Sequence, residues 1–411
     1  RPACPIFLIG FMGTGKSTVG RALGGQLGLT FIDLDRVIEE DAGKSISEIF
    51  DEDGESQFRS LETAALARLS AQGPAVIATG GGAPTHDGNL ETMRHAGLVI
   101  ALDASLDELR RRLGDDASRP LWVTGEDEVE QLYDSRVPIY RRAHAVIQTE
   151  GRGVSETARA VERVVAAAQR LERDSLPDST FLSLAAHEYP IVVGTGLFER
   201  LGEQIRRILG ETTCVAIVSD ENVAGHYLES ASTALSGAGL TVAKTISVRP
   251  GEASKSLSVF GRLCSELVDA GLDRHSTIIA LGGGVVGDLA GFVASALYRG
   301  IRLVQVPTSL LAMVDSAIGG KTGVNLDSGK NLVGSFWQPE LVFADPDVLA
   351  TLPRRERRAA YGELLKYGLL DGEELLADIE SLAGPLGGES WTDDGEFRDR
   401  LARVIRHCAM Y

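Results

Sequence analysis

A glycine-rich segment near the N-terminus has the residue types and the spacing that phosphate binding needs. It reads Gly10-Phe11-Met12-Gly13-Thr14-Gly15-Lys16-Ser17, matches the pattern G-x-x-x-x-G-K-S, and lies between an apolar run and a helix-like pattern. Backbone N–H groups of such a loop surround phosphate oxygens, its lysine neutralises the β- and γ-phosphates, and its serine ligates Mg²⁺. We therefore expect a nucleoside triphosphate site with the binding residues Gly13, Thr14, Gly15, Lys16, Ser17 and Thr18.

Two carboxylates follow this loop in the sequence. Asp33 and Asp35 flank Leu34 at the end of the second apolar run, and the alternation of side chains along a strand predicts that both point to the same side. One carboxylate is suited to a metal ion and the other to an acceptor hydroxyl group. The sequence has no N-K-x-D guanine motif, which disfavours a switch GTPase. These residues together predict a kinase that acts on a small molecule.

The order of the motifs from about Ile6 to Arg170 resembles the shikimate kinase family. The motifs are G-F-M-G-T-G-K-S, D-L-D, F-R-x-x-E, G-G-G-A, R-P-L and P-I-Y-R-R. The resemblance implies ATP-dependent phosphorylation of shikimate to shikimate 3-phosphate, with ATP as a substrate and Mg²⁺ as the cofactor. A gluconate-type kinase of the same P-loop group is the alternative, and the two differ in whether a pair of arginines serves a cyclic carboxylate.

The resemblance also implies roles for individual residues. Asp35 would orient the acceptor hydroxyl, while Lys16 and the lid arginine Arg119 would stabilise the transferring phosphoryl group. Ser17 would bind Mg²⁺ directly and Asp33 through water. Arg112 would contact ATP, although a solvated helix residue is an equally good interpretation of it. The expected shikimate-binding residues are Asp35, Arg59, Gly80, Gly81, Gly82 and Arg141, of which Arg59 and Arg141 would face the carboxylate.

A second glycine-rich segment lies in the C-terminal half. Leu281-Gly282-Gly283-Gly284-Val285-Val286-Gly287-Asp288 follows an apolar run, and its glycines allow the backbone to approach a pyrophosphate closely. The spacing differs from G-x-G-x-x-G, so a standard Rossmann domain is not predicted from this segment alone.

The neighbouring motifs resemble 3-dehydroquinate synthase from about Leu182 to Tyr411. They include P-G-E-A-S-K, P-T-S, D-S-A-I-G-G-K-T-G-V-N, G-K-N-L and E-L-L-K. The resemblance implies a bound NAD⁺ that is regenerated in each turnover, and conversion of 3-deoxy-arabino-heptulosonate 7-phosphate to 3-dehydroquinate with release of phosphate. Both implied reactions belong to the route to aromatic amino acids, but they are not consecutive steps.

Residue roles in this half follow from the same resemblance. The expected NAD-binding residues are Pro250, Gly251, Glu252, Ala253, Ser254, Lys255, Gly284, Val285, Val286, Gly287, Asp288, Thr308, Ser309, Lys321, Lys330, Val348, Leu349, Ala350 and Thr351. The expected substrate residues are Arg299, Asp315, Lys321, Lys330, Asn331 and Lys366, with Lys321 and Lys366 as catalytic residues. Arg299 resembles an arginine that reaches the substrate phosphate across a dimer interface, so a homodimer is expected.

A zinc or cobalt ion is also implied, with Glu363 as its first ligand. The family's two histidine ligands have no counterpart among the 7 histidines of this sequence, and catalytic zinc sites normally use three protein ligands. We therefore expect a fragment of a longer bifunctional protein, and no synthase activity from this chain. The alternative is a working kinase joined to a non-catalytic NAD-binding or dimerisation module.

The secondary-structure elements that position these residues are predicted to form an α/β fold. Apolar runs at 6–9, 30–32, 75–78 and 98–102 alternate with amphipathic helices and predict a doubly wound parallel sheet, closed by a helix at about 155–173. Further strands are expected at 189–193, 214–218, 277–281 and 303–306, with a helix at 256–270. The expected division is a P-loop domain at 1–171, a linker at 172–181, an NAD-binding α/β domain at 182–352 and the start of a helical subdomain at 353–411.

Composition narrows the functional classes. The formal net charge of -17 disfavours nucleic acid as a partner, and no apolar run approaches the ~20 residues that span a bilayer. The N-terminus lacks the pattern of a secretory signal, and the 4 cysteines are far apart, which argues against a disulfide framework. We expect a cytoplasmic enzyme with small-molecule substrates.

Overall fold

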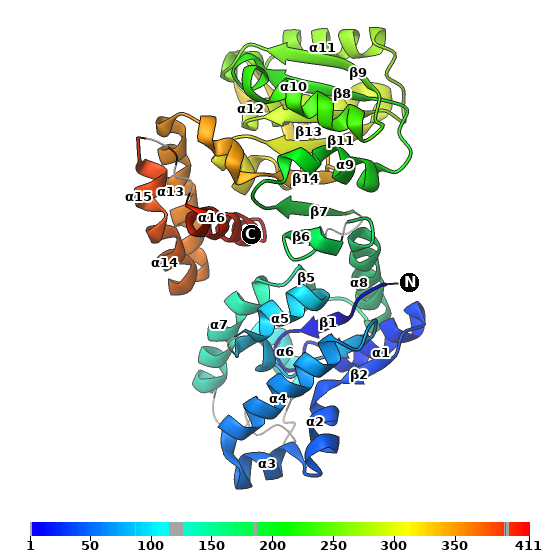
Figure 1. Ribbon diagram of the computed structural model, residues 1–411, viewed down its shortest axis with the longest axis vertical. Coiled ribbons are helices and arrows are strands. Elements are labelled where there is room, and N and C mark those ends of the chain that lie inside the picture. Colours follow the sequence, from blue (N-terminus) through cyan, green and yellow to red (C-terminus); the bar gives the residue numbers. More distant parts are fainter. Residues whose placement is uncertain are drawn as a thin grey trace. The chain divides into compact units, whose positions relative to one another are not determined.

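The computed structural model describes residues 2–86, 88–114, 126–171, 173–183, 187–389, 391 and 394–411. The chain divides into two compact units (Figure 1). The first comprises residues 1–169 and 180–188, and the second comprises residues 170–179 and 189–411.

The first unit is built on a parallel sheet with the strand order β2-β3-β1-β4-β5. The strands are β1 (Ile6–Ile9), β2 (Phe31–Asp33), β3 (Val76–Ala78), β4 (Leu98–Asp103) and β5 (Ala145–Gln148). All four residues of β1 are buried, as expected for the central strand of a sheet that is covered on both faces. The predicted doubly wound sheet is confirmed.

Helices connect these strands. They are α1 (Lys16–Leu27), α2 (Leu34–Ala42), α3 (Ile46–Glu52), α4 (Gly54–Ser70), α5 (Asn89–Ala96), α6 (Leu106–Leu113), α7 (Glu126–Arg141) and α8 (Val154–Ala168). The helix predicted to close the unit begins near the expected residue but ends at Ala168, before 173. Its apolar face is buried, including Val161, Val164 and Val165, and α8 lies against α1.

The second unit contains the parallel strand order β7-β14-β11-β10-β8-β9. These strands are β7 (Glu188–Val193), β8 (Val215–Asp220), β9 (Val242–Val248), β10 (Thr277–Gly282), β11 (Arg302–Pro307) and β14 (Leu341–Ala344). The antiparallel hairpin of β12 (Lys321–Leu326) and β13 (Gly329–Phe336) forms a separate two-stranded sheet. The sequence analysis did not predict β9, β14 or the hairpin. Polar residues and glycines interrupt the apolar pattern of β9 and of the hairpin, whereas β14 is a short, fully buried apolar run.

The helices of the second unit fall into two groups. Four belong to the α/β part: α9 (Leu201–Leu209), α10 (Glu221–Gly237), α11 (Leu257–Asp269) and α12 (Gly284–Ala296). The others follow Pro353: α13 (Arg354–Asp371), α14 (Glu373–Ser381), α15 (Ala383–Gly387) and α16 (Gly395–Cys408). The change to helices that the sequence predicted from residue 353 onward is confirmed (Figure 1).

The stretch expected to be a polar linker, 172–181, is largely built into the fold. It contains a short 3-10 turn, η3 (Arg173–Ser175), and the start of β6 (Ser179–Ser183). Ser175, Leu176 and Ser179 are buried, and the Ser179 hydroxyl donates to the carbonyl of Leu176 at 2.8 Å. Local hydrogen bonds satisfy these polar groups, so polarity alone was a poor guide to exposure.

Candidate active sites

The glycine-rich loop of the first unit forms the cradle that its sequence predicts, between β1 and α1. Gly10 has φ 135°, and a Cβ there would lie 2.2 Å from the carbonyl oxygen of Leu102, so only glycine fits. Lys16 is the first residue of α1, and its Nζ donates to the carbonyls of Gly10 at 2.8 Å and Phe11 at 3.0 Å. The ammonium group is thereby held over the loop and at the positive end of the helix.

Two side chains beside this loop form a pair of hard oxygen donors. The Ser17 hydroxyl donates to Oδ2 of Asp33 at 2.8 Å. Asp33 ends β2, but Asp35 lies in the first turn of α2 and not on the strand. The expected strand alternation was therefore wrong for this pair, because the helix begins at Leu34. Both carboxylates still lie close to one another, since Asp33 raises the pKa of Asp35.

Asp35 and Glu62 converge on the turn that follows β3. A Cβ added to Gly80 would lie 2.9 Å from Asp35 Oδ1 and 3.1 Å from Glu62 Oε1. Both oxygens are buried, and neither has a hydrogen-bond partner among the residues that the structure describes. Burial, and secondarily the charge of Asp33, raises the pKa of Asp35 to about 6, although Lys16 opposes the shift. Burial also raises the pKa of Glu62 against the opposing effect of Arg59.

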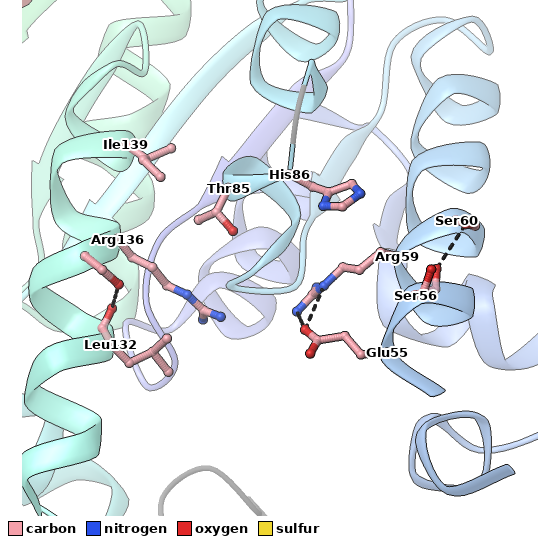
Figure 2. Close-up of a pocket in the computed structure, with 10 residues that line it drawn as sticks. Glu55, Ser56, Arg59, Ser60, Thr85, His86, Leu132, Arg136 and Ile139 are labelled. Carbon is pink, nitrogen blue, oxygen red and sulfur yellow. Dashed lines mark hydrogen bonds and ion pairs between the residues drawn. The ribbon is translucent and has the colours of Figure 1, made fainter. Parts of the chain in front are cut away.

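A cavity of about 720 Å³ lies between α4 and α7 (Figure 2). Arg59 of α4 and Arg136 of α7 extend into it from opposite walls. Arg59 is held in place by hydrogen bonds to Glu55 at 3.0 Å and to Glu62 at 2.8 Å. The lining residues are Glu55, Ser56, Arg59, Ser60, Thr85, His86, Leu132, Ser135, Arg136 and Ile139. Two guanidinium groups that face one space suit an anionic ligand.

The predicted partner of Arg59 was Arg141, but the structure places Arg136 in the cavity. Arg136 and Tyr140 are four residues apart on α7, so they share one helix face, and the Tyr140 hydroxyl donates to the carbonyl of Gly81 at 2.7 Å. Arg141 directly follows Tyr140 on α7 and therefore points in a different direction. It lies near Tyr133: burial raises the pKa of Tyr133, and the charge of Arg141 partly offsets this rise. Helix periodicity groups Arg136 with Tyr140, and the contact between Tyr140 and Gly81 turns that face of α7 toward the cavity.

The turn Gly80–Gly82 joins the cavity to the phosphate loop. A Cβ on Gly81 would lie 3.5 Å from Arg136 Nη1 and also 3.5 Å from the carbonyl oxygen of Gly10. A Cβ on Gly82 would lie 2.6 Å from Arg59 Nη1, so a side chain there would displace the arginine. The phosphate loop, the carboxylates and both cavity arginines therefore meet around a single turn.

Arg112 has a structural role that the sequence reading left open. Its guanidinium donates to Glu108 at 2.7 Å, to the Thr149 hydroxyl at 3.0 Å and to the Thr149 carbonyl at 2.7 Å. Three of its donors are thus used to tie α6 to the segment after β5. The other proposed phosphate ligand, Arg119, lies outside the described residues.

The second unit brings several predicted NAD-binding residues together. Lys255 is buried, and its Nζ donates to Oδ2 of Asp288 on α12 at 2.5 Å and to Oδ1 of Asn331 on β13 at 2.6 Å. Burial raises the pKa of Asp288, an effect that Lys255 opposes, and Glu252 and Asp315 add to the rise. Residues expected to bind the cofactor and the substrate therefore form one connected cluster.

A second group of predicted residues lies near Asp315, which is part of a π-helical turn (Ala312–Ser316). Glu363 and Lys366 of α13 form an ion pair that raises the pKa of Lys366, and Asp315 adds to this rise. π-Helical turns occur frequently at functional sites. Within the described ranges, no three His, Cys, Asp or Glu side chains are grouped to hold a metal ion. A zinc ion bound by Glu363 alone would be under-coordinated.

The other predicted residues of this unit lie on the turns after β10 and β11, on the hairpin and on a short 3-10 helix. A Cβ on Gly283, just before α12, would lie 3.3 Å from Oγ of Ser309. Lys321 and Lys330 are exposed on the hairpin, and Arg299 is exposed with φ 67°. Thr351 ends the 3-10 helix η8 (Pro346–Thr351), where its hydroxyl lies 2.8 Å from that of Tyr227, a residue the sequence reading missed.

The two units of the chain match two different families of known proteins. A family model for shikimate kinase matches residues 12–167, and a model for the N-terminal part of 3-dehydroquinate synthase matches residues 245–359. A 3-dehydroquinate synthase of Symbiobacterium thermophilum is 55% identical over 203 residues, which make up 49% of this chain and 56% of that protein. The chain spans about half the length of the curated relatives it matches.

Solved structures were found for both units. A crystal structure of 2-deoxy-scyllo-inosose synthase complexed with carbaglucose-6-phosphate, NAD⁺ and Co²⁺ is 29% identical, with a TM-score of 0.50, and covers 56% of this chain and 61% of its own. Shikimate kinase from Acinetobacter baumannii in complex with shikimate is 36% identical over 40% of this chain and 93% of its own, with a TM-score of 0.38.

The fold and the sites define a P-loop kinase unit followed by an α/β synthase unit. The first unit matches the shikimate kinase family model, and the second matches the model for the N-terminal part of 3-dehydroquinate synthase. The chain is therefore a fusion of a shikimate kinase-like part and a 3-dehydroquinate synthase-like part.

Proposed function

We propose that the first unit transfers the γ-phosphate of ATP to a hydroxyl group of shikimate in the cavity between α4 and α7. The observation that carries this proposal is the meeting of the phosphate loop, Asp35 and two facing arginines around Gly80–Gly82. Arg59 and Arg136 pair with the substrate carboxylate from opposite sides, which fixes the ring and directs a hydroxyl toward the phosphate loop. A neutral polyol such as a sugar has no carboxylate to pair with these two guanidinium groups.

Asp35 orients the acceptor hydroxyl and takes its proton during transfer. With a pKa of about 6 the carboxyl is mostly ionised at neutral pH, yet it is more basic than an ordinary aspartate. Lys16 and the N-terminus of α1 stabilise the charge on the β- and γ-phosphates. Phosphoryl transfer needs little covalent chemistry from the protein, so positioning and charge stabilisation supply most of the rate enhancement.

Ser17 and Asp33 fit a magnesium ion. Their oxygens are 2.8 Å apart beside the phosphate loop, and Mg²⁺ prefers hard oxygen ligands together with phosphate and water. Ser17 would hold the ion directly and Asp33 through water, and the bound ion would supply positive charge that neutralises the phosphate groups during transfer. Arg119, which the family resemblance makes the lid arginine, would add to this effect.

For the second unit, we propose NAD⁺ binding at the cluster of Glu252, Lys255 and Asp288, beside the N-terminus of α12. The support is the buried Lys255–Asp288 pair, which is connected through Asn331 to the substrate residues. The described residues do not fit a zinc site. We therefore expect NAD⁺ to bind at this cluster, and 3-dehydroquinate to form only where two further zinc ligands join Glu363.

We also propose that the chain forms a homodimer through the second unit. Phe336 and Leu332 of β13 are exposed by 78% and 60%, which is unusual for large apolar side chains unless a partner covers them. The strained loop at Arg299 lies beside this strand, because a Cβ on Gly300 would lie 2.2 Å from the ring of Trp337. Arg299 is therefore suitably placed to enter a partner's site. Light scattering on Phe336→Glu should show monomers, whereas an unchanged dimer would reject this surface.

The test of the kinase proposal is a comparison of phosphate acceptors. The purified chain with Mg²⁺ and ATP should convert shikimate to shikimate 3-phosphate and should leave gluconate unchanged. Turnover of gluconate and none of shikimate would favour the other kinase group.

For the second unit, zinc content and 3-dehydroquinate formation should be measured on this chain and on a C-terminally extended one. Inactivity of both would support a non-catalytic NAD-binding or dimerisation module.

A further inference from the structure

Asn325 connects the cofactor side and the substrate side of the second unit. It lies on β12 where the register of the hairpin shifts between Val324 and Leu326, so its backbone leaves the β12–β13 ladder. Its N–H donates instead to the carbonyl of Lys255 at 2.8 Å. Bulges of this kind redirect a side chain and occur frequently beside active sites.

Both ends of the Asn325 side-chain amide are used. Its Nδ2 donates to Oε1 of Glu252 at 2.8 Å, and its Oδ1 accepts from the backbone N–H of Asn331 at 2.8 Å. Glu252 is expected to bind NAD⁺ and Asn331 the substrate. One half-buried side chain therefore holds one residue from each group.

Asn331 has an unusual backbone conformation. Its φ is 55°, in the left-handed region that glycine and asparagine adopt more readily than other residues. Its side-chain oxygen accepts from Lys255 Nζ at 2.6 Å, so the amide NH₂ group must point the other way and is free to donate. The hydrogen bond that the Asn331 N–H donates to Asn325 Oδ1 fixes the backbone conformation that gives the Asn331 side chain this orientation.

We propose that Asn325 is a positioning residue that couples the NAD⁺ site to the substrate site by holding Glu252 and Asn331 together; this rests on the NAD⁺ binding proposed above. Asn325 touches neither ligand directly in this account. It acts by fixing the carboxylate of Glu252 on one side and the left-handed backbone of Asn331 on the other. The two functions of its amide can be separated by mutation, since aspartate keeps the acceptor but loses the donor.

The experiment compares Asn325→Asp and Asn325→Ala, with Ser328→Ala in the exposed hairpin turn as the matched control. The NAD⁺ dissociation constant is measured by calorimetry, and deuterium uptake at the Asn331 amide by mass spectrometry. Asn325→Asp should weaken NAD⁺ binding about tenfold, because it places a second carboxylate against Glu252, and should keep the amide protected. Asn325→Ala should weaken NAD⁺ binding and also expose the amide to exchange. The control should alter neither.

The outcomes separate this inference from the proposed function. If the unaltered chain does not bind NAD⁺, the proposed function of the second unit is wrong. If it binds NAD⁺ and both Asn325 variants bind within about twofold of it, the coupling role is wrong. Loss of the fold in both variants would also overturn the inference, because Asn325 would then be a general structural residue and not a link between two sites.

Discussion

Replacing Asp35 by asparagine should stabilise the first unit at neutral pH while it abolishes most of the kinase activity. The pKa of Asp35 rises from 3.8 to about 6, mainly through burial, so the ionised side chain is held at a cost in the folded state. Because its pKa is higher in the folded state, the protonated carboxyl favours folding relative to the ionised one. This contribution is complete below pH 3.8 and is lost as the pH rises through about 6. The native carboxylate is thus a local destabilisation retained for function.

The magnitude follows from the shift. About two pKa units at 1.36 kcal/mol each correspond to roughly 3 kcal/mol at pH 7.5, and the penalty falls to about half of this at pH 5. Asparagine removes the charge and keeps the shape. Its NH₂ group can also donate to the buried Oε1 of Glu62, which lacks a partner among the described residues.

Hydrogen exchange of the β1 amides measures this effect separately from the second unit. Protection of Ile6–Ile9 should increase in Asp35→Asn at pH 7.5 and increase about half as much, in free energy, at pH 5. Asp51→Asn on the exposed face of α3 is the matched control and should change little. A destabilised Asp35→Asn, or a gain that does not depend on pH, would refute the reasoning about the buried carboxylate.

Four further results are expected. The kcat/KM for shikimate should fall as the pH drops below about 6, because Asp35 becomes protonated; a flat profile between pH 5 and 7 would exclude it as the base. Arg136→Ala should raise the KM for shikimate about 10- to 100-fold, and Arg141→Ala should leave it nearly unchanged. A large rise in Arg141→Ala and none in Arg136→Ala would instead support Arg141 as the residue that faces the carboxylate with Arg59. Glu62→Gln should shift the pH profile to lower pH, since Glu62 raises the pKa of Asp35, and an upward shift would contradict this. Lys255→Ala should abolish measurable NAD⁺ binding in calorimetry, and retained affinity would place the cofactor elsewhere.

Much of the fold was accessible from the sequence, because the strands of both units are short continuous apolar runs. β1 and β10 each precede a glycine-rich turn and a helix, so the motifs themselves mark the ends of the strands. β13 could not be found in this way. Its glycines and the charged Lys330 give no alternating pattern, and only pairing with β12 makes it a strand.

The site was predicted less completely, for two physical reasons. Asp35 was assigned to a strand because the sequence D-L-D contains no clear signal that a helix begins at Leu34. Arg136 was missed because the choice between it and Arg141 depends on which face of α7 meets Gly81, a tertiary contact made by Tyr140. The link between Glu252 and Asn331 through Asn325 involves residues 73 and 6 positions apart in the sequence, which no local pattern reveals.

The described helices include none long and apolar enough to cross a membrane. The decisive measurement is the initial rate of shikimate 3-phosphate formation from ATP and shikimate by the unaltered chain, compared with Arg136→Ala and Arg141→Ala. We expect rapid product formation by the unaltered chain, a higher KM for shikimate in Arg136→Ala, and a nearly unchanged rate in Arg141→Ala. No product from shikimate, with ATP consumed when gluconate is the acceptor, would contradict it.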